Sequence, residues 1–193
     1  MRKIFSSKTH WFVALLLAAA LLFGGCSSDS DDDDDDSSSS SSSSASSSNA
    51  LSPYLPSEYA SREIAALYTA SSSETDTEDD GTVWTIKATS ALYFFSDSGD
   101  ITWLETNNFL GISSTGETES IKRAHAAGTF TISGNYTNGT ITVTRTMHEG
   151  NGETAGVLES CDDYGDTSLK TLSISNGIFT RIRHGETESY TKQ

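Results

Sequence analysis

The stretch that decides the fold reads "GTFTISGNYTNGTITVTRT" and covers residues 128–146. Phe130 and Ile132 alternate with threonine and serine in its first half, and the second half repeats the alternation. A period of two is typical of strands that bury one face in an antiparallel sheet. Asn138-Gly139 lies between the halves, and Asn-Gly favours a tight hairpin because both residues tolerate positive φ. The stretch therefore predicts a β-hairpin.

The same alternation recurs over most of the chain beyond Gly81. Eight strands are expected, at residues 82–89, 90–96, 100–107, 117–126, 128–133, 139–146, 168–175 and 177–184. Asn176-Gly177 and residues 97–100 supply further turns. Because hairpins alone connect these strands, residues 81–193 are predicted to form an all-β domain, an eight-stranded antiparallel up-and-down barrel. A β-sandwich is the alternative, since alternation does not distinguish closure from stacking.

Residues 51–80 differ in pattern from the strands. After Pro56, the apolar residues Ile64, Leu67 and Tyr68 recur at helical spacing, and an acidic residue lies near the start. Serines and the acidic stretch 74–80 follow. We expect a short amphipathic helix that packs on the domain, followed by an acidic linker.

The N-terminal 25 residues have the layout of a secretory signal. Arg2, Lys3 and Lys8 precede an apolar run at residues 11–23, and small residues follow it. A helix needs about 20 apolar residues to span a bilayer, and this run is shorter. Residues 1–25 are therefore predicted to direct export and to be removed.

The end of this segment, Phe23-Gly24-Gly25-Cys26, resembles the lipobox of bacterial lipoproteins in the relaxed form found in spirochaetes. The resemblance implies cleavage between Gly25 and Cys26, diacylglycerol on the Cys26 sulfur, and a fatty acyl group such as palmitate on the new amino terminus. More than one acyl chain anchors a protein firmly to a membrane. Ser27 favours the outer membrane by analogy with other lipoproteins.

Residues 26–50 are almost wholly serine and aspartate beyond Cys26, so they bury too little apolar surface to fold. We expect a disordered tether of low complexity that spans roughly 25–30 Å on average. The formal net charge of the chain is −15, and no basic patch is present. The excess of negative charge and the lack of a basic patch argue against nucleic acid as a partner.

A second resemblance covers the β domain. Gly81-Thr82-Val83-Trp84 is similar to the Gly-x-Trp motif that opens lipocalins and bacterial lipocalin-like domains. The resemblance implies a barrel that binds a small hydrophobic ligand. It also implies that Arg181 or Arg183, in the last strand, covers Trp84.

The inward positions of such a barrel are predicted to be apolar. An eight-stranded barrel is either filled by side chains or holds one small ligand. The leading hypothesis is an envelope lipoprotein whose β domain binds a small hydrophobic ligand or a surface partner, and the alternative is a structural or host-interaction lipoprotein with a solid barrel. The residues expected to line a cavity are Trp84, Phe94, Trp103, Phe130, Ile141 and Ile174.

Motifs for catalysis, metal or cofactor binding are absent from the sequence. It contains no Gly-x-Ser-x-Gly, phosphate-binding loop or metalloprotease motif, and the histidines lack zinc-ligand spacing. An enzyme is not expected, and no catalytic residue, metal or cofactor is predicted. Cys161 is the only cysteine besides Cys26, and it is expected to be a buried or half-buried small side chain.

Overall fold

The structure is a computed structural model that describes residues 50–150, 157–161, 169–183 and 186–193. Over these ranges the protein is all-β and antiparallel, as the alternating residues predict, and it contains no α-helix. In chain order the elements are a 3-10 turn Ser57–Tyr59, β1 Ile64–Thr77, β2 Val83–Phe95, β3 Trp103–Ser113, β4 Thr118–Gly134, β5 Gly139–Glu149, β6 Leu158–Ser160, β7 Leu169–Ile174, β8 Ile178–Arg183 and β9 Glu186–Lys192. The signal peptide, Cys26 and the tether predicted for residues 1–49 lie outside the described residues.

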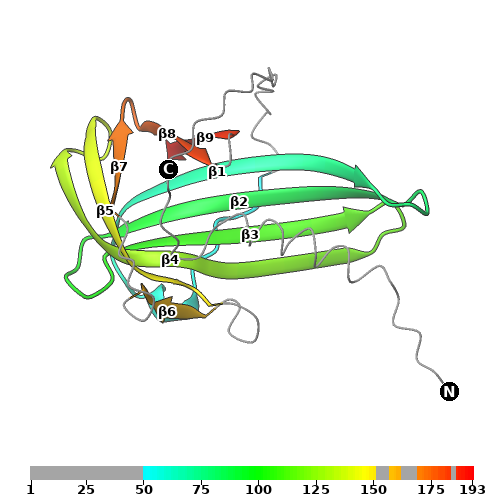
Figure 1. Ribbon diagram of the computed structural model, residues 1–193, viewed down its shortest axis with the longest axis horizontal. Helices are drawn as coiled ribbons and strands as arrows, with labels where there is room; N and C mark the ends of the chain where they lie inside the picture. The colour runs from blue at the N-terminus through cyan, green and yellow to red at the C-terminus, as the bar shows by residue number, and fades with distance from the viewer. Residues whose placement is uncertain (1–49, 151–156, 162–168, 184–185) are drawn as a thin grey trace, which may run out of the picture.

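The strands form one sheet that is curled into a half-barrel (Figure 1). Neighbouring strands follow the order β6-β5-β4-β3-β2-β1-β9-β8, and β7 pairs with β5. The long strands β1 to β4 run the length of the molecule, and β5, β7, β8 and β9 gather around one end of them. We call this end the curled half. Its inner surface is the concave face of the sheet.

Beyond the curled half, β1 to β4 continue as a four-stranded sheet, which we call the open half (residues 70–77, 83–91, 106–113 and 118–125). β1 meets β9 only at Tyr68 and Thr69, and β4 meets β5 only from Ala126 onward. In the described part of the chain, the outer edges of β1 and β4 therefore have no strand partner over the open half.

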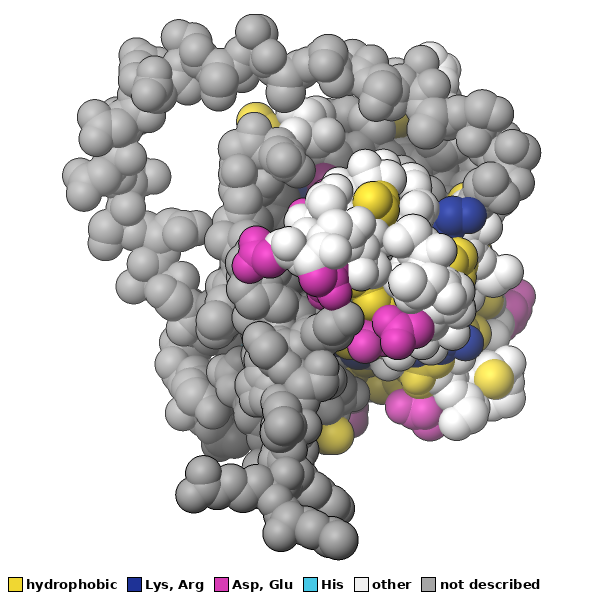
Figure 2. Space-filling model, turned by 90° about the vertical axis from the view of Figure 1, so that its right-hand side faces the viewer, with side chains coloured by type: hydrophobic (Ala, Val, Ile, Leu, Met, Phe, Trp, Pro, Cys, Tyr) yellow, Lys and Arg dark blue, Asp and Glu magenta, His cyan; other side chains and the backbone are white. Residues whose placement is uncertain are grey.

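Charged side chains lie along these edges and at the turns that end the open half. Figure 2 views the molecule from that end and shows acidic side chains around the tips of the hairpins. Glu74 lies on the edge of β1 and Glu119 on the edge of β4, while Asp79 and Glu117 lie at the turns. Charges on an edge strand oppose pairing with another chain, so these residues protect the open half from association.

The apolar core of the curled half lies on the concave face. It draws side chains from eight strands, β1 to β5 and β7 to β9: Ala66, Tyr68, Leu92, Phe94, Trp103, Ala126, Ile141, Val143, Leu172, Ile174, Phe179 and Tyr190. Residues directly opposite in an antiparallel pair share a face, and the register places Phe94 opposite Trp103 and Tyr68 opposite Leu92. Burial of these side chains drives the curl of the sheet.

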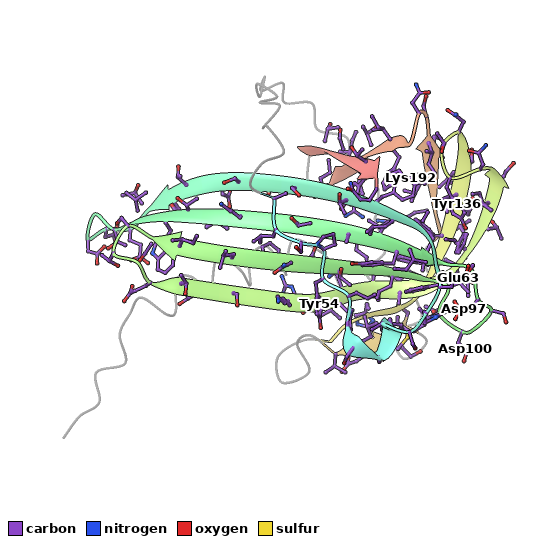
Figure 3. The ribbon with its side chains drawn as sticks, turned by 180° about the vertical axis from the view of Figure 1, so that it is seen from behind. Tyr54, Glu63, Asp97, Asp100, Tyr136 and Lys192 are labelled. Atoms are coloured by element: carbon purple, nitrogen blue, oxygen red, sulfur yellow. The ribbon has the colours of Figure 1, made fainter. Side chains whose placement is uncertain are left out.

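The outer face is covered by the segment that precedes β1. Leu55 and Tyr59 pack on a second apolar cluster that includes Tyr93 and Leu104. Thr106 Oγ1, on the same face, donates a hydrogen bond to the carbonyl of Tyr54 at 2.6 Å. Figure 3 shows this segment crossing the back of the sheet. The segment before β1 therefore belongs to the folded domain.

The prediction of a helix within residues 51–80 is wrong. Only the 3-10 turn Ser57–Tyr59 forms, and β1 begins at Ile64. Ala66 and Tyr68 are buried on the concave face, whereas Leu67 packs against the outer cluster. Leu67 and Tyr68 thus pack on opposite faces of the sheet while Ile64 is 41% exposed, and pairing with β2 outweighs the helical spacing. The boundary expected before Gly81 falls within the turn of the β1–β2 hairpin.

Two pairs of expected strands are single strands. β2 covers both 82–89 and 90–96, and β4 covers both 117–126 and 128–133. Nothing between the members of each pair ends a strand, and Gly128 lies at a β-bulge instead of a turn. The sheet is a half-barrel, so neither the fully closed barrel nor the two-sheet sandwich describes it.

Of the two predicted Asn-Gly turns, Asn176-Gly177 is confirmed. Asn138-Gly139 does not form a tight turn, because neither residue has a positive φ and Gly139 is the first residue of β5, paired with Gly134 across a longer loop. Asn176 and Gly177 have φ of 52° and 75°, as a two-residue hairpin of this type requires. Asn138 Oδ1 accepts a hydrogen bond from the backbone N–H of Asn176 at 2.9 Å. The Asn176-Gly177 turn therefore contacts the β4–β5 loop at one corner of the curled half.

Candidate functional site

Five of the six residues predicted to line a cavity meet in the concave core. Phe94, Trp103, Ile141 and Ile174 belong to one buried cluster, and Phe130 packs against it. The Phe94 and Phe130 rings are 5.0 Å apart between centroids, in an edge-to-face arrangement. The structure therefore brings these five residues together in the apolar core.

Trp84 is not part of this cluster. It lies in the open half, where it forms a small buried group with Ile86. The contacts of Arg181 are on other strands, so Arg181 does not cover Trp84 as the lipocalin resemblance implies. The Arg183 side chain lies outside the described residues.

Aromatic rings occupy the centre of the curled half. Tyr68 and Phe179 have ring centroids 5.3 Å apart, and Phe179 stacks on Tyr190 at 4.8 Å. These three side chains and Phe94 are at most 1% exposed. Close ring packing of this kind is typical of a filled interior. The chemically distinctive part of the concave face lies farther along the strands, where it becomes polar.

A buried ionic cluster borders the aromatic core. Arg181, on β8, donates to Glu105 on β3 through Nη2 at 2.6 Å and Nη1 at 3.3 Å. Its Nε donates to Glu188 Oε2 on β9 at 2.8 Å. The Arg181 guanidinium also lies over the Tyr190 ring, 4.8 Å from its centroid. One arginine therefore joins three strands of the half-barrel.

The electrostatics of this cluster keep Arg181 charged. Burial is the largest single effect and lowers the pKa of Arg181, but the charge and hydrogen bonding of Glu105, together with Tyr190 and Glu188, raise the pKa by more in total. Glu105 is only 4% exposed, so this ion pair is largely shielded from water. Every guanidinium nitrogen of Arg181 donates to one of these partners. The cluster is saturated and is best understood as a structural link.

A second polar group lies one row farther along, in the open half. Ser90 on β2, Asn107 on β3 and Arg123 on β4 are directly opposite one another in the register. Ser90 Oγ donates to Asn107 Oδ1 at 2.8 Å. Arg123 Nη1 and His125 Nδ1 lie 3.4 Å from the two carboxylate oxygens of Glu149, at the end of β5. We call Ser90, Asn107 and Arg123 the polar row.

The polar row differs from the Arg181 cluster because its donors are not saturated. Asn107 Nδ2 and both Nε and Nη2 of Arg123 are buried and have no hydrogen-bond acceptor in the described part of the chain. Asn107 is 2% exposed and Arg123 is 9% exposed. A buried donor without an acceptor costs about 1–3 kcal/mol, more when it is charged. Such donors are rare in native proteins and point to a missing partner.

An apolar stripe continues from the polar row toward the end of the open half. Ala88, Phe109 and Ile121 form the next row on the concave face, and Ile86 and Trp84 follow along β2. The Arg123 guanidinium carbon is 5.5 Å from the centroid of the Phe109 ring. In the described part of the chain, no strand crosses over this stripe (Figures 1 and 3).

Cys161 is fully buried, as predicted from the sequence, and its Sγ lies 3.6 Å from His148 Nδ1. The described residues contain no cluster of histidine, cysteine and acidic side chains that is suited to a metal ion. Over the same residues, no helix is long and apolar enough to cross a membrane.

Sequence reasoning missed the charged residues of the concave face, although part of the signal was present. Glu105 and Asn107 lie an even number of residues from Trp103 and therefore on the same face of the strand. Arg123 lies on the same face as Ile121 for the same reason. A charged residue in an inward register is a signal of a buried ion pair or a binding site. The bulge around His125 shifts the alternation of β4 and hides the pattern there.

Comparison with known proteins identifies no relative of this chain. No family model matches it, and neither does any curated protein or solved structure.

Proposed function

We propose that the protein is a membrane-anchored envelope lipoprotein whose lipocalin-like β domain binds a small, largely apolar ligand. The observation that carries the binding role is the apolar stripe in the open half, from Ala88 and Phe109 to Trp84, on a concave face that no described strand crosses. An apolar surface that leads to a few buried polar groups is the usual composition of a ligand site.

The membrane anchor is proposed from the sequence. Cleavage before Cys26 and acylation of its sulfur would leave the polar tether between the bilayer and the β domain. The protein is then exported and held by lipid, with the outer membrane as the proposed location. The membrane and a small hydrophobic ligand or a surface protein are the proposed partners.

Mass spectrometry of the mature protein tests the anchor. The expected N-terminal peptide begins at Cys26 and carries diacylglycerol and an amide-linked acyl group. The Cys26→Ser variant should remain unprocessed and lack the thioether-linked lipid. A mature protein with an unmodified Cys26 thiol would overturn the anchor.

Tryptophan quenching tests the binding site. The mature chain would retain Trp84 and Trp103, since Trp11 lies in the signal. With the lipoprotein on vesicles, ω-bromohexadecanol should quench the fluorescence of Trp84, because bromine quenches tryptophan on contact. The Trp84→Phe variant is the control, since Trp103 lies in the filled core. Quenching that is equal in the two proteins would reject the stripe as the binding surface.

A further inference from the structure

We infer that the ligand is a long-chain aliphatic carboxylate whose head group binds to Arg123 and Asn107 of the polar row. This inference rests on the proposed binding function and adds the chemical class of the ligand. It is drawn from the buried donors of the polar row and from their place at the end of the apolar stripe.

The donor geometry suits a carboxylate. Arg123 contacts Glu149 through Nη1 alone, at the long distance of 3.4 Å, so Nε and Nη2 remain without an acceptor. These two nitrogens form one fork of the guanidinium, and such a fork binds both oxygens of a carboxylate in parallel. Asn107 Nδ2 lies in the same row and adds a third donor.

The contrast with Arg181 supports this assignment. Arg181 also lies on the concave face, yet two carboxylates of the chain occupy its donors. The Arg123 side chain is 10% exposed, against 20% for Arg181, and it has one weak acidic contact. Desolvated charged donors favour a charged acceptor far more than a neutral one. An anionic head group therefore satisfies Arg123, and an uncharged ligand does not.

The stripe sets the shape of the rest of the ligand. Trp84 lies six positions before Ser90 on β2, which corresponds to roughly 20 Å at the rise of an extended strand. Ala88, Ile86 and Trp84 present a side chain to the concave face at every second residue of this path. A long, narrow aliphatic chain fits this path better than a compact ring system.

The test compares two probes that differ only in the head group. The lipoprotein is placed on vesicles at mildly alkaline pH, and ω-bromohexadecanoate or ω-bromohexadecanol is titrated while quenching of Trp84 is followed. Empty vesicles correct for partition of each probe into lipid. The carboxylate should bind about ten- to a hundredfold more tightly than the alcohol, as expected for a charge-assisted two-point contact.

Variants of Arg123 test whether the preference for the carboxylate over the alcohol comes from the polar row. Arg123→Gln should reduce the affinity for the carboxylate to that for the alcohol, and Arg123→Lys should reduce it in part because the planar fork is lost. Lys122→Gln is the matched control, since it removes the same charge from the adjacent, exposed position of β4 and should change neither affinity. Unchanged binding of the alcohol to Arg123→Gln shows that the variant is folded.

The outcomes separate the two proposals. Equal affinity for both probes, or a carboxylate preference that survives Arg123→Gln, overturns the head-group assignment and leaves the binding function in place. If neither probe quenches Trp84 in the native protein, the binding function fails and this inference fails with it.

Discussion

Arg181 on β8 and Glu105 on β3 form a two-point ion pair across the inside of the half-barrel, although 76 residues separate them in the chain. The pair joins strands that are not neighbours in the sheet. Because the sheet is not closed by a continuous ladder, this contact holds β8 and β9 against the centre of the curled half. It stabilises the curl at a point where backbone hydrogen bonds do not.

The first prediction concerns this pair. Arg181→Met leaves the Glu105 carboxylate buried without its cation, and loss of one partner of a buried pair costs roughly 3–5 kcal/mol. We expect the free energy of unfolding to fall by an amount near the lower end of this range, since the Arg181 side chain is 20% exposed. The double variant Arg181→Met with Glu105→Leu should recover much of the loss. Urea unfolding of the four proteins in this cycle measures the coupling, and additive effects of the two changes would contradict it.

A second prediction concerns Arg62 and Asp97. Arg62 Nε and Nη2 donate to the two carboxylate oxygens of Asp97, each at 2.8 Å, and tie the β2–β3 turn to the chain before β1. The hydrogen bonds from Arg62 are the largest effect that lowers the pKa of Asp97 in the folded protein. A lowered pKa stabilises the fold above the unfolded-state pKa, and that contribution disappears as the pH falls through the folded-state value.

Asp97→Asn should therefore destabilise the protein at neutral pH and have little effect in strong acid. The effect is expected to be small and reduced by salt, because Asp97 is exposed. Asp100→Asn, a change to an exposed residue of the same turn, is the matched control. Thermal unfolding as a function of pH provides the measurement, and an Asp97→Asn difference that persists in acid would show that the pair is not its cause.

The sequence was sufficient for the class of fold, but not for its closure. Alternation around Phe130 and Ile141, with Asn-Gly turns, predicts antiparallel strands because burial of one face imposes a period of two. Alternation does not indicate where a strand ends, so the pattern predicts two strands where β2 is one continuous strand, and likewise for β4. Ile64, Leu67 and Tyr68 fit a helix and a strand equally well, and only pairing with β2, which is a long-range contact, decides between them.

The candidate site was predictable only in part. Apolar inward positions such as Phe94 and Trp103 follow from parity within one strand. The polar row depends on the register between β2, β3 and β4, which sets Ser90, Asn107 and Arg123 side by side. Bulges in β4 shift that register, and no local pattern in the sequence records the shift. The missing acceptor for Arg123 is visible only after the side chains are placed.

A third prediction concerns Gly128, at the bulge between β4 and β5. A Cβ atom added there would lie 2.0 Å from the carbonyl oxygen of Thr144 and 2.9 Å from the backbone nitrogen of Thr146. Because both atoms belong to the backbone of β5, relief requires the strands to separate. Gly128→Ala should cost about 3 kcal/mol, at the upper end for overpacking.

Gly99→Ala is the control for Gly128→Ala. An added Cβ at Gly99 meets no atom closer than 3.8 Å, so the free energy of unfolding should change little. Chemical denaturation of both variants tests the comparison. Equal stability of the two variants would mean that β5 does not approach β4 as closely as the bulge indicates.

The last prediction concerns alkaline pH and Tyr68, at the centre of the aromatic core. Burial, together with the neighbouring Tyr136, raises the pKa of Tyr68 to about 12, and its hydroxyl donates a hydrogen bond to the Tyr136 carbonyl. An unfolded tyrosine ionises near pH 10. The stabilisation from neutral Tyr68 is therefore complete below about pH 10 and is lost as the pH rises toward 12.

Tyr68→Phe removes both the hydrogen bond and the ionisable group. It should lower the stability by about 1 kcal/mol at neutral pH. The difference from the native protein should then shrink between about pH 10 and pH 12, because only the native protein loses the contribution of Tyr68 there. Burial also raises the pKa of Tyr93 to about 12, but its hydroxyl makes no hydrogen bond to another described residue. Tyr93→Phe should therefore have almost no effect on stability at pH 7 and still reduce the loss of stability at alkaline pH, which separates the hydrogen bond from the titration.

Urea unfolding of the three proteins from pH 7 to 12 provides the measurement. Parallel curves of stability against pH for Tyr68→Phe and the native protein would show that Tyr68 ionises as readily in the folded state as in the unfolded state.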